Sequence, residues 1–162
     1  LVGAVTHSRE TAAPRIPAAL AASKQSARGR LGMIENLLNT AFRFIGVPYR
    51  SGQSGPHGFD CSGFTSYVYR QHNLTLTRSS RSQYTEGAPV AGIADMRKGD
   101  LVFFGGRGGG SRVGHVGIVT EVNSANGSFK FIKASTSSGV RVDNSTDPYF
   151  SRRYVGARSI IQ

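Results

Sequence analysis

The first apolar pattern along the chain has a helical period. Between residues 31 and 45, apolar side chains recur three and four positions apart, which places them on one face of a helix. They are Ile34, Leu37, Leu38, Ala41, Phe42 and Ile45. Gly46 and Pro48 end this helix. Helical spacing resumes after Cys61, and a third, shorter helical segment is expected over Arg78–Tyr84.

After Gly99 the pattern changes to that of β-strands. The following segments are continuously apolar, rich in β-branched residues, or alternate between apolar and polar positions. The expected strands are Leu101–Phe104, Val116–Val122, Phe129–Ala134, Val140–Val142 and Val155–Ile161. Helices followed by antiparallel strands predict an α+β domain, with N-terminal helices packed on a mostly antiparallel sheet of about five to six strands.

The N-terminal segment differs from the rest of the chain. Residues 1–30 lack a sustained apolar period and combine Ala, Ser and Pro with scattered basic residues. We interpret them as a flexible basic tail or linker. Residues 31–162 are interpreted as one domain, because a chain of 162 residues suits a single hydrophobic core.

Charge narrows the range of partners. The chain has 20 Lys and Arg residues against 9 Asp and Glu, a formal net charge of +11. Such an excess favours polyanions, and charge alone fits an anionic cell-wall polymer, a membrane surface or a nucleic acid. No aromatic–basic nucleic-acid-binding module is recognisable, so nucleic acid is not the expected partner. No apolar run approaches the ~18–20 residues of a membrane-spanning helix.

The single cysteine, Cys61, lies in the segment Gly-Phe-Asp-Cys-Ser-Gly-Phe, residues 58–64. By count alone, a lone cysteine is more often a small buried hydrophobe than a reactive thiol. This one follows a glycine-rich loop and begins a helical run, where unpaired backbone N–H groups and the helix dipole favour the thiolate. The same N–H groups can stabilise an oxyanion on a substrate carbonyl. We therefore predict that Cys61 is a nucleophile.

A thiol nucleophile needs a base, and the chain has four histidines. His115 opens a predicted strand, and a strand packed across the start of a helix can direct an imidazole at the first helical residue. A strand histidine alone is more often a hydrogen-bonded core residue; together with Cys61, His115 is predicted to be the base. The other histidines lie in the tail, just before Cys61 and at the end of the following helix: His7, His57 and His72. One cysteine and scattered histidines lack metal-ligand spacing, so neither a metal nor a cofactor is expected.

Five short segments occur in unbroken order over roughly residues 31–161. They are Gly-Val-Pro-Tyr at 46–49, Gly-Phe-Asp-Cys-Ser-Gly-Phe at 58–64, Lys-Gly-Asp-Leu-Val-Phe-Phe at 98–104, Gly-His-Val-Gly-Ile at 114–118, and the ending from Asp147 to Arg158. Together they resemble the NlpC-type family of cell-wall cysteine peptidases. The resemblance implies a papain-like α+β fold and hydrolysis of amide bonds in peptidoglycan stem peptides, often between γ-D-glutamate and a following diamino acid.

The resemblance also implies roles for individual residues. Cys61 and His115 match the nucleophile and the base, as the residues alone predict. Tyr49 matches a residue that lines the site and helps to hold the oxyanion. Asp60 and Ser62 match residues that recognise the free amino end of the stem peptide.

The chain departs from the family pattern at Lys133, where a histidine is usual. The third group normally accepts or shares a hydrogen bond with the base, whereas a lysine ammonium has donors only. Beside His115, Lys133 would disfavour the protonated imidazole and reduce activity; alternatively, its side chain would extend to solvent. We keep Lys133 as the candidate third catalytic residue. A second departure is Ser51-Gly52-Gln53, where the family often has a tryptophan and two glycines, so specificity is expected to differ.

These observations lead to one expected function and two alternatives. The first is an exported cell-wall hydrolase, located in the periplasm, attached to the outer membrane or at the cell surface, with peptidoglycan stem peptides as substrate. The second is a catalytically weakened domain that binds peptidoglycan or an acidic partner through the same groove. The third is an amidase or acyltransferase that uses the same Cys–His pair. The oligomeric state is left open.

Overall fold

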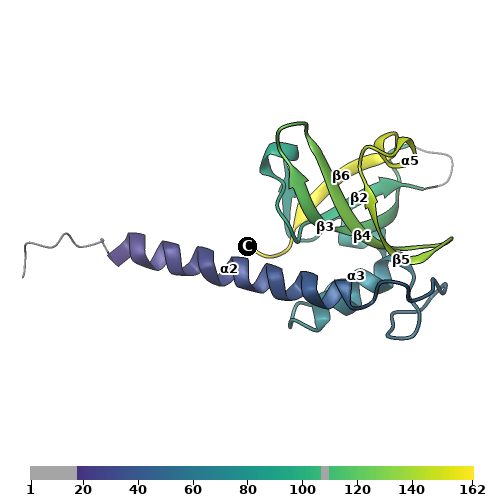
Figure 1. Ribbon diagram of the computed structural model, residues 1–162, viewed down its shortest axis with the longest axis horizontal. Helices are drawn as coiled ribbons and strands as arrows, with labels where there is room; N and C mark the ends of the chain where they lie inside the picture. The colour runs from purple at the N-terminus through teal and green to yellow at the C-terminus, as the bar shows by residue number, and fades with distance from the viewer. Residues whose placement is uncertain (1–17, 107–109) are drawn as a thin grey trace, which may run out of the picture. The chain divides into compact units, whose positions relative to one another are not determined.

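The computed structural model describes residues 18–106 and 110–162, with side chains from residue 26 onward. The chain divides into two compact units, Leu1–Leu31 and Gly32–Gln162. The helices are α2 (Ala18–Phe42), α3 (Cys61–Arg70), α4 (Ser80–Gln83) and α5 (Pro148–Ser151), with a 3₁₀ turn at Ile93–Asp95. The strands are β1 (Ala88–Val90), β2 (Leu101–Gly105), β3 (Val113–Asn123), β4 (Ser128–Ser135), β5 (Gly139–Asn144) and β6 (Tyr154–Ser159) (Figure 1).

The six strands form one sheet in the order β1-β6-β2-β3-β4-β5, and all neighbouring strands are antiparallel. Strands β2 to β5 form a meander, and β6 returns to pair with β2. The structure therefore confirms the predicted α+β class, with helices first and an antiparallel sheet after them.

Several elements differ from those predicted. Helix α2 begins at Ala18 rather than near Leu31, because residues 18–22 are alanines and a leucine, which favour helix without requiring a buried face. Residues 1–17 of the predicted tail lie outside the described residues. Helix α4 is shorter than the predicted segment, and β1 and α5 were not predicted. These last two have three and four residues, too few for an apolar period to be visible.

Buried side chains form two clusters, one on each face of the sheet. Strand β2 contributes to both, because its alternate residues point to opposite faces: Leu101 and Phe103 belong to the first cluster, and Val102 and Phe104 to the second. The first cluster also contains apolar residues of α2 and α3, including Ile34, Leu37, Phe64 and Val68. The second contains Phe129, Phe131 and Phe150. Burial on both faces explains why β2 is a continuous apolar run.

The start of α3 is fixed by the Asp60 side chain and by the loop before it. Asp60 is the N-cap residue, and its Oδ1 accepts a hydrogen bond of 2.7 Å from the Gly63 amide. Asp60 Oδ2 accepts a second bond of 3.1 Å from the Gly52 amide, which ties the loop to the helix. Gly63 has no space for a side chain, since a Cβ there would lie 2.2 Å from the Gln53 carbonyl oxygen.

This packing predicts that Gly63→Ala lowers the free energy of unfolding by about 1–3 kcal/mol, as overpacking a closed site does. The matched control is Gly32→Ala, also within a helix, where a Cβ meets no atom within 4 Å. That control should be neutral or stabilising by about 0.5–1 kcal/mol. Urea unfolding of the two variants measures both effects. A Gly63→Ala protein as stable as the wild type would contradict the described contact between the loop and α3.

Candidate active site

The structure places Cys61 at the first position of α3, against the backbone of β3. Its side chain is buried, with 9% of the residue exposed, and its Sγ lies 3.9 Å from the Gly114 carbonyl oxygen. The Val116 amide also acts on the thiol. These two backbone groups flank His115, so α3 and β3 bring the two predicted catalytic residues together.

Burial raises the pKa of the Cys61 thiol. The Lys133 ammonium and the backbone amides of Val116 and Ser62 act in the opposite direction but do not outweigh burial. The prediction that the helix start makes Cys61 a thiolate is therefore wrong, although the helix does begin at Cys61. At neutral pH the resting side chain is a thiol.

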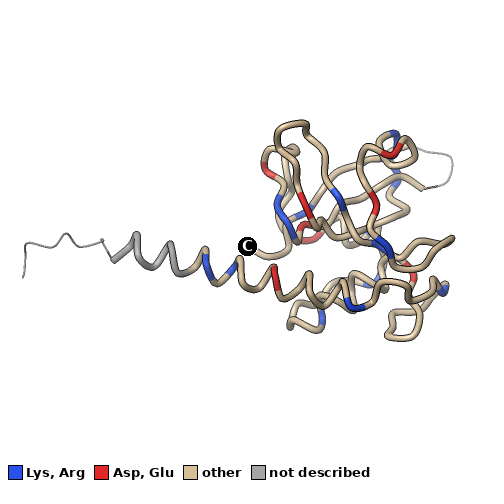
Figure 2. The backbone as a smooth tube through the Cα atoms, in the orientation of Figure 1, with Lys and Arg blue, Asp and Glu red and all other residues tan. Residues whose placement is uncertain are grey.

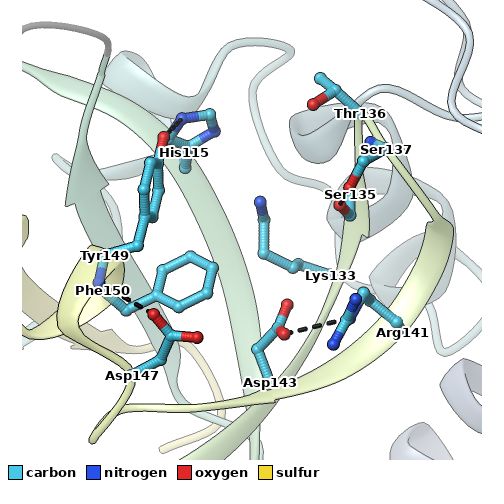
Figure 3. Close-up of a pocket in the computed structure, with 10 residues that line it drawn as sticks. All are labelled: His115, Lys133, Ser135, Thr136, Ser137, Arg141, Asp143, Asp147, Tyr149 and Phe150. Atoms are coloured by element: carbon cyan, nitrogen blue, oxygen red, sulfur yellow. Dashed lines mark hydrogen bonds and ion pairs between the residues drawn. The ribbon is translucent and has the colours of Figure 1, made fainter.

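His115 lies on β3, which begins at Val113 rather than at the histidine itself. Its half-buried ring has Nε2 at 3.4 Å from the Tyr149 hydroxyl (Figure 3). The pKa of His115 is lowered to about 4, mainly by burial and in addition by the nearby cations Lys133 and Arg153. The resting pair is thus a neutral thiol and a neutral imidazole.

Tyr149 was not predicted from the sequence as a site residue. It belongs to α5, whose first turn is capped by Asp147 through a bond of 2.8 Å to the Tyr149 amide. The Arg153 guanidinium lies 3.9 Å from the centre of the Tyr149 ring and donates to the Tyr149 carbonyl oxygen at 3.1 Å. Since the hydroxyl contacts a histidine 34 residues earlier, no local sequence pattern could have indicated this contact.

Lys133 lies on β4 and is buried, with 5% of the residue exposed. Its ammonium is 5.5 Å from the centre of the Phe150 ring, and its charge contributes to lowering the pKa of His115. The alternative in which this side chain extends to solvent is therefore wrong. Lys133 lies near the base, where the sequence analysis expected a cation to disfavour the imidazolium.

Asp60 and Ser62 lie on the other side of Cys61 and are joined by Arg78. The Arg78 guanidinium donates to Asp60 Oδ1 at 3.0 Å, to Asp60 Oδ2 at 2.8 Å and to Ser62 Oγ at 2.8 Å. Burial alone would raise the pKa of Asp60, but hydrogen bonds from Arg78 and Gly63 lower it, so the carboxylate is ionised. Arg78 was missed in the sequence because it follows Asp60 by 18 residues and stands in a loop without a recognisable motif.

Tyr49 is half-buried and close to the same group. Burial raises the pKa of the Tyr49 hydroxyl, and the charges of Cys61 and Asp60 raise it further, so the hydroxyl is protonated and able to donate. Its backbone forms a bridge with Phe59, two residues before Cys61. The structure therefore places all three residues suggested by the family resemblance, Tyr49, Asp60 and Ser62, near the thiol.

Two cavities open beside His115. One, of about 310 Å³, lies among β4, β5 and α5 and is lined by His115, Lys133, Ser135, Thr136, Ser137, Arg141, Asp143, Asp147, Tyr149 and Phe150 (Figure 3). The other, of about 520 Å³, is lined by Gly106, Gly114, His115, Thr136, Tyr149 and Arg153. The base therefore borders enough space for a peptide substrate.

Neither a metal site nor a membrane span is found in the part of the chain that the structure describes. Within residues 18–106 and 110–162, no three His, Cys, Asp or Glu side chains are grouped to hold a metal ion. In the same ranges, no helix has both the length and the apolar character needed to cross a bilayer.

A cysteine at the start of a helix, packed against a strand that carries a histidine in an antiparallel sheet, is typical of the papain-like class of fold. Residues 46–159 match the NlpC/P60 family, and the chain belongs to that family. It is 41% identical over 117 residues to the Escherichia coli K12 protein named murein DD-endopeptidase MepS/murein LD-carboxypeptidase, an alignment that covers 72% of this chain and 57% of the relative. The chain thus spans little more than half of that relative.

Solved structures agree with this assignment. An NlpC/P60 family protein from Bacillus cereus superposes with a TM-score of 0.70 at 31% identity, covering 80% of this chain and 40% of that one. The NlpC/p60 domain of the peptidoglycan hydrolase SagA superposes with a TM-score of 0.62 at 30% identity, covering 78% of this chain and 97% of the domain. The papain-like fold predicted from the sequence is confirmed.

The environment of His115 predicts its titration. In an NMR titration, the ring should protonate near pH 4, because burial and two cations oppose the imidazolium. Lys133→Met should raise this pKa without restoring the ordinary value of about 6.5, since burial remains.

The matched control is Lys130→Met, which removes a cation from the same strand at an exposed position paired with Glu121. It should leave the titration unchanged. A wild-type His115 that titrates near pH 6.5 would show that burial and the two cations do not control the base.

Proposed function

We propose that this chain is a cell-wall hydrolase, a cysteine-type endopeptidase that cleaves amide bonds in peptidoglycan stem peptides. The observation that carries the proposal is the position of Cys61 at the start of α3, against the two backbone groups that flank His115. The names of relatives support the substrate class, since one is a murein endopeptidase and another a peptidoglycan hydrolase.

In the proposed mechanism, His115 acts as a general base on a neutral thiol. We assign the tautomer in which Nε2–H donates to the Tyr149 hydroxyl, which leaves Nδ1 unprotonated and able to act as the base. As Sγ attacks the substrate carbonyl carbon, the thiol proton moves to His115. The imidazolium then gives this proton to the leaving amine as the C–N bond breaks. Water, deprotonated by His115, releases the acyl group and restores the thiol.

The start of α3 supplies the stabilisation that this attack needs. The Cys61 N–H is an unpaired donor at the helix N-terminus, and the protonated Tyr49 hydroxyl is a second donor near the thiol. Two such donors directed at the carbonyl oxygen stabilise the negative charge of the tetrahedral intermediate. Tyr149 acts as the positioning residue for the base, because its hydroxyl can accept a hydrogen bond from the imidazole. The Lys133 ammonium has donors only and cannot accept that bond.

Asp60, Ser62 and Arg78 are proposed to bind the amino end of the stem peptide. The ionised carboxylate of Asp60 attracts an ammonium group. Arg78 fixes the orientation of this carboxylate with two hydrogen bonds. Ser62 Oγ accepts from Arg78 at 2.8 Å and donates to Asp60 Oδ1 at 3.5 Å, so all three residues form one hydrogen-bonded group. This side of the site thus holds the acyl half of the substrate.

The bond between γ-D-glutamate and the following diamino acid is our first candidate for cleavage. The recognition of a free amino end by Asp60 favours it, because that bond lies a short distance from the amino end of a stem peptide. A second candidate, a bond between two D-configured residues, is suggested by the name of the E. coli relative, a murein DD-endopeptidase. Masses of the released fragments distinguish the two bonds.

Two other functions remain alternatives to this proposal. A binding module would keep the groove and lack turnover, and the buried cation Lys133 is the observation that favours it. An amidase or acyltransferase would use the same cysteine and histidine on another acyl donor. Both are distinguished from the proposal by incubation with purified peptidoglycan.

We also propose that the protein acts outside the cytoplasm, in the periplasm or at the cell surface, where peptidoglycan is located. The net charge of +11 favours approach to anionic wall polymers or membrane surfaces. Within residues 32–162, Lys and Arg occur on helices and strands with Asp and Glu between them (Figure 2). The charge is thus spread along the chain rather than concentrated in one element.

The proposal predicts that the wild-type protein releases soluble peptide-containing fragments from purified peptidoglycan, and that Cys61→Ala releases none. His115→Ala should be nearly as inactive, because nucleophile and base act together. Tyr149→Phe should retain cleavage at a lower rate, about 10-fold or less below wild type for one neutral hydrogen bond of about 1 kcal/mol. Liquid chromatography with mass spectrometry measures the fragments.

Sedimentation with insoluble peptidoglycan provides the control for folding and binding, and the Cys61→Ala protein should still sediment. Fragment release by Cys61→Ala equal to that of the wild type would contradict the mechanism. Sedimentation of all variants with no release by the wild type would favour the binding module.

A further inference from the structure

The cavity among β4, β5 and α5 contains the side chain of Lys133, which makes no hydrogen bond or salt bridge to the residues that the structure describes. Lys133 has 5% of its surface exposed, and Figure 3 shows its amine directed into the cavity between His115 and Ser135. The amine lies 5.5 Å from the centre of the Phe150 ring. Burial lowers the pKa of Lys133 and the charge of Asp143 raises it, so a further anion in the cavity would stabilise the ammonium.

The acidic side chains that line the cavity are already engaged. Asp143 Oδ1 lies 3.0 Å from Arg141 Nε on the same strand. Asp147 caps α5 through the Tyr149 amide. Arg141 therefore opposes the effect of the Asp143 charge on Lys133, and Asp147 faces the positive end of a helix turn. Lys133 remains as the cation that an incoming anion can pair with.

The cavity also contains neutral donors of the kind that a carboxylate accepts from. Ser135, Thr136 and Ser137 follow Lys133 along the end of β4 and line the same space. Carboxylates bind best where a cation and hydroxyl or amide donors converge. The chemistry of the lining therefore fits a carboxylate group on a peptide.

The position of the cavity indicates which half of the substrate it receives. It borders His115, the residue that gives a proton to the leaving amine in the proposed mechanism, and it is formed by β4, β5 and α5. The proposed amino-end site is formed by Asp60, Ser62 and Arg78, at the start of α3 and in the loop after it. The cavity is therefore placed for the leaving-group half.

We propose that this cavity binds a carboxylate on the leaving-group half of the substrate, with the Lys133 ammonium as its ion partner. The inference rests on the proposed function and adds a specificity-determining residue to it. It gives the lysine at the third catalytic position a role in substrate selection.

The binding of a carboxylate would also affect the base. Lys133 lowers the pKa of His115 through its charge, and a bound carboxylate neutralises that charge. The pKa of His115 then rises, and the base accepts the Cys61 proton more readily. An anionic substrate thus improves its own cleavage, whereas a neutral one does not.

The first test compares two substrates that differ only in this charge: L-alanyl-γ-D-glutamyl-meso-diaminopimelate and its analogue with the diaminopimelate carboxyl groups amidated. Wild type should favour the carboxylate form in kcat/KM by about 10- to 100-fold, as expected for a hydrogen-bonded ion pair. Lys133→Met should abolish the preference, and Lys130→Met should keep it. An unchanged ratio in Lys133→Met would overturn the proposal, whatever its absolute rate.

The second test does not require turnover. In the Cys61→Ala protein, N-acetyl-D-alanine should shift the NMR resonances of His115 and raise its pKa, and N-acetyl-D-alaninamide should do neither. Lys133→Met in the same background should abolish the response. Equal responses to the acid and the amide, or a response that persists without Lys133, would overturn the carboxylate site. A positive binding result without any cleavage would instead refute the proposed function alone.

Discussion

The candidate site depends on the contact between the first residue of α3 and one edge of β3. Strand β3 pairs with β2 from Val113 to Ile118, but with β4 only from Ile118 to Asn123. N-terminal to Ile118, the Gly114 carbonyl and the Val116 amide are directed at Cys61. The thiol thus lies where β4 would otherwise continue the sheet, and residues of both strands border it.

A buried polar network keeps α3 in this position. The Thr65 hydroxyl donates to Gln83 Oε1 at 2.8 Å, and Gln83 Nε2 donates to the Thr77 carbonyl oxygen at 2.8 Å and to Ser66 Oγ at 3.0 Å. With Asp60 at the helix start, these bonds connect α3 to α4 and to the loop that carries Arg78. The acyl-side residues and the nucleophile are therefore held by one rigid group of hydrogen bonds.

Local patterns were sufficient to predict the α+β class and a helix that starts at or near Cys61, and the joint action of Cys61 and His115 stays a prediction. The family resemblance added Tyr49, Asp60 and Ser62, which the structure places beside the thiol. Arg78, Tyr149 and Arg153 could not be predicted, because their contacts join segments that only the tertiary fold brings together. The protonation state of Cys61 was mispredicted for a similar reason: the helix start favours a thiolate, but the burial that opposes it depends on the packed sheet.

The central claim is that Cys61 is a nucleophile that His115 activates, and covalent trapping with a substrate-like electrophile tests it most directly. Native protein is incubated with L-alanyl-γ-D-glutamyl chloromethyl ketone, and the modified residue is identified by peptide mass mapping. The account predicts one adduct, on Cys61, that forms much more slowly in His115→Ala and is prevented by excess stem peptide. Modification of Cys61 only after denaturation, or at the same rate without His115, would contradict it.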